Sequence, residues 1–252
     1  MTLKKNDEIN NRIRNRINEA EVKEAFFTCK APNDPERLVY DGIIAENNPP
    51  ELLFLLKEAN DGRDNSRKDN LEFDSFVEQA RKDAIEQNGK NPKHWDNLCY
   101  WTSAYKAARE GTSYSFLDDE VQKCGGLLGE IALVNIKKVP GGSSTNPGIF
   151  IHTVTNDVCA KLVRDEISWI NPKIVVCCGT YDYAREIYKQ CNKLPKSIPL
   201  KCGAYYFVFD GIYYLEFIHP TQYRSVAAKR SLLYAYAKEV FKDLVNKMKE
   251  ES

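Results

Sequence analysis

The sequence lacks any long apolar run: no stretch of its 252 residues approaches the roughly 18 apolar residues of a membrane span. The first residues, MTLKKNDEINNRIRNR, also lack the apolar centre of a signal peptide. The composition, 42% apolar and 29% charged, is that of an ordinary folded protein. We therefore expect a cytoplasmic protein that makes no membrane contact.

Metal-binding patterns are lacking as well. The eight cysteines form no C-x-x-C pair and repeat no spacing that zinc or iron–sulfur sites use. Adjacent Cys177 and Cys178 end an apolar run, where the buried thiols of a strand are commoner than metal ligands. We expect reduced thiols, no metal and no other cofactor.

Neither sign of charge is in excess. The 36 basic and 36 acidic residues cancel, so no global field would draw the protein onto nucleic acid. A DNA contact would need a local basic patch, for which Lys137, Lys138 and Arg224 are candidates and solvated surface charge is the alternative. The G-x-G-x-x-G and P-loop glycine patterns are also missing, which disfavours a sugar-nucleotide enzyme or another phosphate-binding hydrolase.

Several apolar runs end abruptly in polar residues. Residues 52–56 (LLFLL) lead into the polar segment 57–62 (KEANDG), and the runs at 131–134 and 174–178 end in the same way. Buried parallel strands have this apolar character, and open parallel sheets bind ligands outside the carboxyl ends of their strands. We therefore expect a functional site where these strands end.

Helical and strand patterns alternate along the chain, which predicts an α/β fold. Helices are predicted at residues 3–27, 94–109, 116–128, 156–169, 181–191 and 226–248, and a short edge strand at 39–44. Asp210 and Gly211 between two apolar segments predict a hairpin with strands at 205–209 and 212–217. The expected organisation is an N-terminal helical arm at 1–30 and a single domain at 31–252.

Four segments resemble motifs of the uracil-DNA glycosylase superfamily and occur in the same order. They are Glu58-Ala59-Asn60-Asp61, residues 134–140 (VNIKKVP), residues 171–179 (NPKIVVCCG) and His219-Pro220-Thr221. The resemblance covers about residues 51–230 and implies a three-layer α/β/α sandwich with a central, mainly parallel sheet. Asn60 and Asp61 depart from the usual proline and glycine, and Val139 stands where the iron–sulfur branch has a cysteine, which argues against a cluster.

The resemblance implies cleavage of an N-glycosidic bond, which develops positive charge on the sugar and negative charge on the departing base. Glu58, Asn60 and Asp61 are the candidates for positioning water beside the sugar, and the sequence does not choose between them. His219, one of three histidines, is the candidate donor to the departing base. The alternatives are an ordinary turn at residues 60–62 and a structural role for the histidine.

Asn135 carries a donor and an acceptor, the pattern that can read the Watson–Crick edge of a flipped base. The resemblance implies a pyrimidine-like target, with Ala59 and Phe73 as further candidates in the base site. The candidates for contacting DNA are Lys137, Lys138, Thr221, Gln222, Tyr223 and Arg224, with Tyr223 as a wedge and Arg224 on phosphate. A backbone cap at Asn135 and an ordinary loop at 221–224 are the alternatives.

The leading hypothesis is a monofunctional DNA glycosylase that removes a uracil-like or modified pyrimidine and leaves an abasic site. The charged segment 63–93 suggests an enlarged pocket, which would suit antiviral removal of hypermodified phage bases such as glucosylated hydroxymethylcytosine. The alternative is a catalytically inactive DNA-binding module on the same fold, consistent with the departures at Asn60 and Asp61. DNA is the expected partner, a monomer is the expected state, and the identity of the base stays open.

Overall fold

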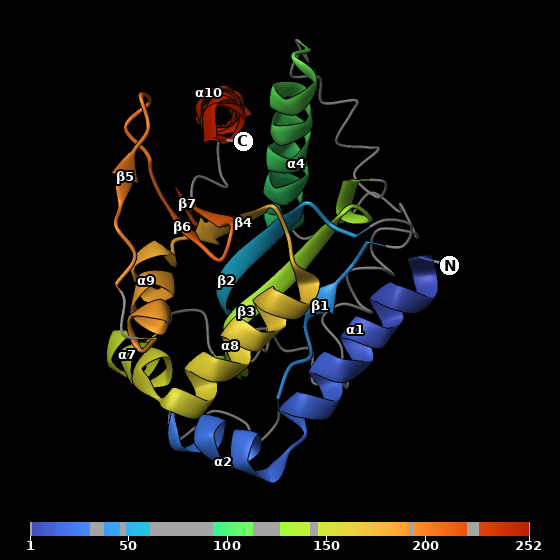
Figure 1. Cartoon of the computed structure of the whole chain (residues 1–252), viewed down its shortest axis with the longest axis vertical. Coiled ribbons are helices and arrows are strands. Elements are labelled where there is room, and N and C mark those ends of the chain that lie inside the picture. The colour runs from blue at the N-terminus through green and yellow to red at the C-terminus, as the bar shows by residue number, and fades with distance from the viewer. Residues whose placement is uncertain are drawn as a thin grey trace.

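Seven strands form one mixed sheet in the order β1-β3-β2-β4-β7-β6-β5 (Figure 1). The structure is a computed structural model that describes residues 2–30, 38–45, 49–60, 93–112, 127–141, 146–191, 194–220 and 227–251. Within these residues the sheet is flanked by seven helices, so the α/β fold predicted from the sequence is confirmed.

The centre of the sheet is parallel and its two margins are antiparallel. The parallel strands are β3 (Ile131–Gly141), β2 (Leu52–Asn60), β4 (Ile174–Cys178) and β7 (Ile212–Phe217). One margin is β1 (Gly42–Ile43), and the other consists of β6 (Tyr205–Phe209) and β5 (Ile198–Pro199). All five residues of β4 are buried, as expected for a parallel strand that is covered on both faces.

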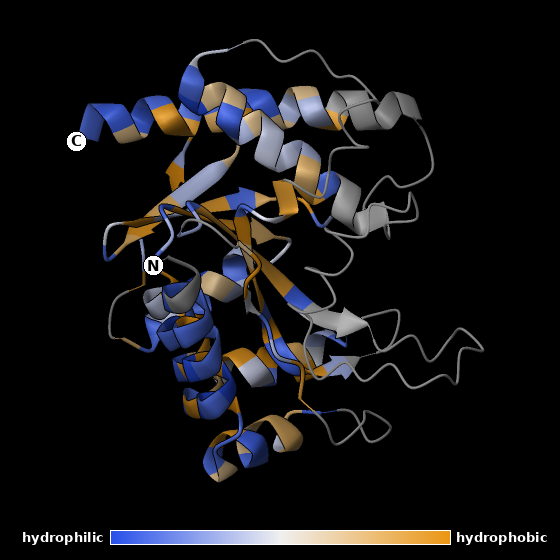
Figure 2. Cartoon of the chain, turned by 90° about the vertical axis from the view of Figure 1, so that its right-hand side faces the viewer, coloured by the Kyte–Doolittle hydropathy of each residue, from blue (hydrophilic) through white to orange (hydrophobic). Residues whose placement is uncertain are grey.

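Helices cover both faces of the sheet and enclose two apolar cores (Figure 2). One face carries α1 (Thr2–Ile17), α2 (Ala20–Thr28), α7 (Pro147–Thr155), α8 (Asp157–Ile170) and α9 (Tyr181–Lys189). The other face carries α4 (Lys93–Glu110) and α10 (Ala227–Glu251). Alternate residues of β2 supply the two cores: Leu53 and Leu55 pack on the α8 side, and Phe54 packs on the α4 side.

Local sequence signals predicted several elements correctly. The side chain of Asn156 accepts hydrogen bonds from the backbone N–H groups of Val158 (3.0 Å) and Cys159 (3.1 Å), and α8 begins there as predicted. Asp210 and Gly211 both have positive φ angles, 50° and 78°, as the tight hairpin between β6 and β7 requires. The predictions for β4 and α4 are also confirmed.

The two longest strands differ from the prediction. β2 continues through the polar residues to Asn60, and β3 continues through Lys137 and Lys138 to Gly141, where a basic loop was expected. The register shifts along this extension, since Glu58 pairs with Lys137 whereas Asn60 pairs with Gly141. α7 and β5 were not predicted, and the segments 63–92 and 116–126 lie outside the described residues.

The N-terminal arm forms two helices, α1 and α2, where one was expected. Their inward residues Ile13, Ile17 and Phe26 are fully buried in the core on the α8 side. Asn10 of α1 also pairs with the edge strand: its side chain donates to the carbonyl of Ile43 at 2.9 Å and accepts from the same residue's N–H at 2.8 Å. The arm therefore covers the β1 edge of the sheet.

None of the described helices combines the length and the apolar composition that crossing a membrane requires.

Candidate functional site at the carboxyl edge of the sheet

The four parallel strands end side by side and bring predicted site residues together. The register pairs Asn135 of β3 with Leu56 of β2, and Cys178 of β4 with Phe217 of β7. His219 follows β7 by two positions, so it lies at the same edge as Asn135. This carboxyl edge, which the ends of the apolar runs indicated, is where open parallel sheets bind ligands.

Gly179 and Thr180 hold the end of β4 against both neighbouring strands. The N–H of Gly179 donates to the carbonyl of Phe217 at 2.8 Å, and the hydroxyl of Thr180 donates to the carbonyl of Leu55 at 2.8 Å. Gly179 has a φ of +66°, and a Cβ at this position would lie 3.5 Å from the Cβ of His219. The left-handed turn at the glycine therefore allows the close approach of the histidine.

Asn135 is the most unusual polar residue at this edge. Its side chain is fully buried, and among the described residues neither its amide nitrogen nor its amide oxygen has a hydrogen-bond partner. Its backbone N–H donates to the carboxylate of Asp41. Leaving a buried donor or acceptor unpaired costs about 1–3 kcal/mol, so such a group usually has a functional or structural reason.

Asn97 on α4 reaches the loop that contains the histidine. Its side-chain amide donates to the carbonyl of Pro220, the residue after His219. α4 is held above this edge by Trp101, whose ring packs edge-on against Phe217 with 4.7 Å between the ring centroids. The loop after β7 is therefore fixed from the helical layer as well as from β4.

Sequence reasoning did not single out Asn97 or Lys57. Asn97 lies four residues before Trp101, so a polar residue on the buried face of an amphipathic helix was the available signal. Lys57 is half-buried beside Tyr183, with its ammonium nitrogen 5.9 Å from the ring centroid, and its Cε lies 3.9 Å from a Cβ placed on Gly179. It places a positive charge close to the site.

The two lysines of β3 do not form a surface patch. The ammonium of Lys138 is fully buried and bonds to Asp41 at 2.7 Å and to Glu166 at 2.5 Å. Lys137 is also buried. The expected DNA contact by Lys138 is therefore wrong, because both carboxylates face its ammonium inside the core.

The remaining predicted site residues are described only in part or not at all. For Glu58, Ala59 and Asn60 the structure describes the backbone, which belongs to β2, and not the side chains. The candidates that lie outside the described residues are Asp61, Phe73, Thr221, Gln222, Tyr223 and Arg224. The choice of a water-positioning residue thus stays a prediction.

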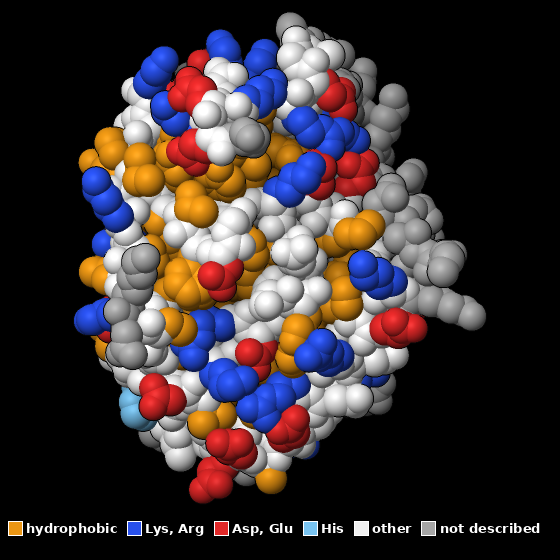
Figure 3. All heavy atoms as spheres, in the orientation of Figure 1, with side chains coloured by type: hydrophobic (Ala, Val, Ile, Leu, Met, Phe, Trp, Pro, Cys, Tyr) orange, Lys and Arg blue, Asp and Glu red, His pale blue; other side chains and the backbone are white. Residues whose placement is uncertain are grey.

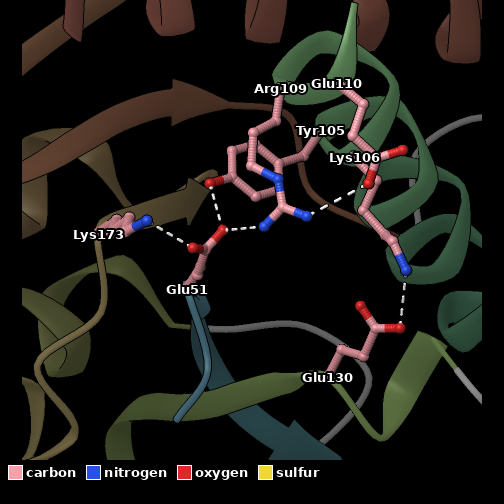
Figure 4. Close-up of polar contacts among 7 residues, drawn as sticks. All are labelled: Glu51, Tyr105, Lys106, Arg109, Glu110, Glu130 and Lys173. Carbon is pink, nitrogen blue, oxygen red and sulfur yellow. Dashed lines mark hydrogen bonds and ion pairs between the residues drawn. The ribbon is translucent and has the colours of Figure 1, made fainter. Parts of the chain in front are cut away.

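A hollow of about 540 Å³ lies at the opposite, amino edge of the sheet. There Glu51 accepts hydrogen bonds from Lys173 (2.5 Å), Arg109 (2.6 Å) and Tyr105 (2.9 Å), as Figure 4 shows. Burial would raise the pKa of Glu51, but these three donors outweigh it and lower the pKa to about 2. Every charged side chain drawn in Figure 4 has a partner of opposite charge, so we interpret this hollow as a structural junction between α4 and the sheet.

The molecular face drawn in Figure 3 carries intermingled acidic and basic side chains and no wide patch of one sign. Exposed large apolar residues are few in the described part of the chain: Ile151, Leu194, Tyr205, Val208 and Tyr236. This face therefore offers no strong electrostatic field to nucleic acid.

The cysteines of β4 are packed thiols. Cys177 and Cys178 are fully buried, and burial raises the pKa of both. No group of three or more His, Cys, Asp or Glu side chains in the described residues could hold a metal ion.

Comparison of the chain with protein-family models gives no match, and comparison with curated proteins gives no significant match.

Proposed function

We propose that this protein is a DNA glycosylase that hydrolyses the N-glycosidic bond of a flipped uracil-like or modified pyrimidine base and leaves an abasic site. The observation that carries the proposal is the fully buried carboxamide of Asn135, whose donor and acceptor have no partner among the described residues. A flipped base would supply both missing hydrogen bonds.

The chemistry of an amide suits a pyrimidine edge. Uracil presents a ring N–H beside a carbonyl, so a single carboxamide can accept from the first and donate to the second. A site that already holds an unpaired amide gains these bonds without first breaking others, which favours the complementary base over one that leaves the amide unpaired. Asn135 can therefore bind a uracil-like edge, and the proposed pyrimidine class comes from the resemblance of its segment to the glycosylase motif.

His219 is the proposed donor to the departing base. Cleavage breaks the bond between C1′ of the sugar and the base nitrogen, and the electron pair leaves with the base. An imidazole N–H directed at the base would stabilise this charge, and the ammonium of Lys57 would add a longer-range attraction. Gly179 and Asn97 keep the histidine and its loop in place.

A water molecule completes the reaction. Its oxygen bonds to C1′ of the sugar, one of its protons passes to a carboxylate, and the released base takes up a proton. Glu58 and Asp61 are the carboxylate candidates, and Asn60 could orient the water through its amide. Glu58 and Asn60 belong to the end of β2, directly beside β3.

The test uses the purified full chain with duplex DNA that contains uracil, ordinary, hydroxymethylated or glucosylated pyrimidines. Alkali-sensitive abasic sites in at least one of these DNAs are expected, and Asn135→Leu should abolish them. DNA binding without base release would support the alternative, a catalytically inactive binding module. A protein that neither binds any of these DNAs nor releases a base from them would overturn the proposal.

A further inference from the structure

We propose that Asp41 is a positioning residue: it holds the backbone of β3 so that the carboxamide of Asn135 stays unpaired and available to a base. The role of the base rests on the proposed function. The hydrogen bond from the backbone N–H of Asn135 to Asp41, called the tether below, is a property of the fold and can be tested without measuring activity.

Asp41 uses both carboxylate oxygens. Oδ2 accepts the backbone N–H of Asn135, and Oδ1 accepts the ammonium of Lys138 at 2.7 Å. The same ammonium donates to Oε2 of Glu166 on α8 at 2.5 Å. All of these side chains are buried, so the bonds are formed away from water, where electrostatic attraction is stronger.

The tether and the amide lie on opposite faces of β3. Leu133, two residues before Asn135, packs in the core on the α4 side, whereas Ile136 packs in the core on the α8 side. Side chains alternate along a strand, so the carboxamide of Asn135 faces α4 and the ammonium of Lys138 faces α8. The charged network therefore fixes the strand without filling the site.

The tether lies beside an irregular stretch of the strand pairing: Asn135 itself still pairs regularly with Leu56, and Lys138 lies in the irregular stretch. Between the pairs Glu58–Lys137 and Asn60–Gly141, β3 advances by four residues while β2 advances by two. Regular pairing does not fix the register of that stretch, and a slip of one residue that spread from it to Asn135 would turn the carboxamide to the other face. A charge-assisted hydrogen bond at Asn135 opposes that slip.

The hydrogen bonds of the network assign the tether to Asp41 rather than to Glu166, because it is Asp41 that accepts the backbone N–H of Asn135. Two carboxylates face one ammonium, and burial raises the pKa of Glu166, whose Oε1 has no partner among the described residues. Glu166 is therefore the carboxyl group that takes the proton. Asp41 accepts hydrogen bonds from both the ammonium of Lys138 and the backbone N–H of Asn135.

This difference supplies a matched pair of variants. In Asp41→Asn the side chain cannot accept from both the Asn135 N–H and the ammonium, since one oxygen is replaced by a donor. Glu166→Gln imitates a protonated glutamate and keeps an acceptor for Lys138. Both variants change one carboxylate to an amide in the same network.

Amide hydrogen exchange, resolved by residue with NMR, measures the tether directly. We expect the backbone N–H of Asn135 to be protected from exchange in the wild type. Asp41→Asn should speed its exchange roughly 10-fold or more, and Glu166→Gln should leave the exchange rate within about twofold of the wild type. Equal exchange in the wild type and in folded Asp41→Asn would overturn the inference. If Asp41→Asn does not fold, rapid exchange of Asn135 in the wild type would overturn it instead.

Base release measures the consequence. We expect Asp41→Asn to reduce the preference of the enzyme for its best base over the other bases, and Glu166→Gln to preserve that preference. An equal loss on every DNA would indicate general damage and would contradict positioning. A wild type that releases no base would overturn the proposed function, while the exchange measurement would still decide on the tether.

Discussion

Gly179 and His219 lie in close contact at the carboxyl edge of the sheet. A Cβ on Gly179 would be 3.5 Å from the histidine Cβ and 3.8 Å from its backbone nitrogen. The glycine joins the end of β4 to its helix, and the histidine follows β7. The position of the proposed leaving-group donor therefore depends on a backbone conformation that glycine adopts readily.

Gly179→Ala should weaken both the fold and base release. Placing a Cβ at a φ of +66° costs about 1–2 kcal/mol, and a change of this backbone angle would shift the contact with the adjacent histidine. We expect a loss of that size in the free energy of unfolding, measured in urea, and a fall in base release of roughly 10-fold or more.

Gly203→Ala is the matched control. Gly203 has a φ of +89°, but a Cβ there would meet nothing within 4 Å. The Gly203→Ala variant should lose a similar free energy of unfolding to Gly179→Ala but release base at the wild-type rate. Equal base release by both variants would show that Gly179 does not position the histidine.

Asn97→Ala should make the loop that contains His219 more mobile, because it removes the contact of that loop with α4. The variant loses the hydrogen bond to the carbonyl of Pro220, which contributes about 1 kcal/mol to stability, and leaves that carbonyl without this donor. We expect a lower kcat for base release with a smaller effect on KM. Asn18→Ala, which removes an exposed hydrogen bond to the carbonyl of Arg14 and another from the hydroxyl of Tyr40, both away from the site, should change neither quantity.

Local signals account for the parts of the fold that were predicted correctly. Asn156 caps α8 through its own side chain, and Asp210-Gly211 forms its hairpin from adjacent residues. Such contacts can be recognised in a short stretch of sequence. The position of Asn135 at the carboxyl edge of the sheet could also be predicted from local sequence, because it directly follows the apolar run 131–134.

The parts that were missed depend on distant partners. Lys138 remains in a strand because Asp41, 97 positions away, and Glu166, 28 positions away, neutralise its charge. Asn97 contacts a carbonyl 123 positions away. Charge alone predicted a surface loop for Lys138, since neither carboxylate stands beside it in the sequence.

Glu166→Gln should remove a pH dependence of stability. Burial and the charges of Asp41 and Asp165 raise the pKa of Glu166 against the attraction of Lys138, so above the ordinary glutamate pKa the folded state holds a proton that the unfolded state has lost. Stability therefore falls as the pH rises from about 5 toward 8.

As the pH rises from about 5 to 8, we expect the free energy of unfolding of Glu166→Gln to gain at least about 1 kcal/mol relative to that of the wild type, measured by urea unfolding. Glu250→Gln, at an exposed position on α10, serves as the control and should show no such gain. An identical pH dependence in the wild type and in Glu166→Gln would contradict the assignment of the proton.

Glu51→Gln should remove a pH dependence of the opposite sign. The pKa of Glu51 is lowered to about 2, so its stabilising effect is complete above the ordinary glutamate pKa of about 4.5 and is lost as the pH falls toward 2. At pH 7 we expect a loss of about 1–2 kcal/mol, reduced by salt because the site is partly exposed. Glu130→Gln, whose partner Lys106 is near the surface, should lose less than about 0.5 kcal/mol.

Asn135→Leu separates function from stability most sharply. Leucine matches asparagine in branching and in the number of side-chain heavy atoms, although its methyl groups are larger, and it removes two buried polar atoms that have no partner among the described residues. The free energy of unfolding should therefore stay the same or rise by up to about 1–3 kcal/mol. The same change removes the donor and acceptor proposed to read the base, and base release should fall at least roughly 100-fold. A marked loss of stability would instead indicate that the amide has a structural partner, and base release at the wild-type rate would exclude Asn135 as the reader of the base.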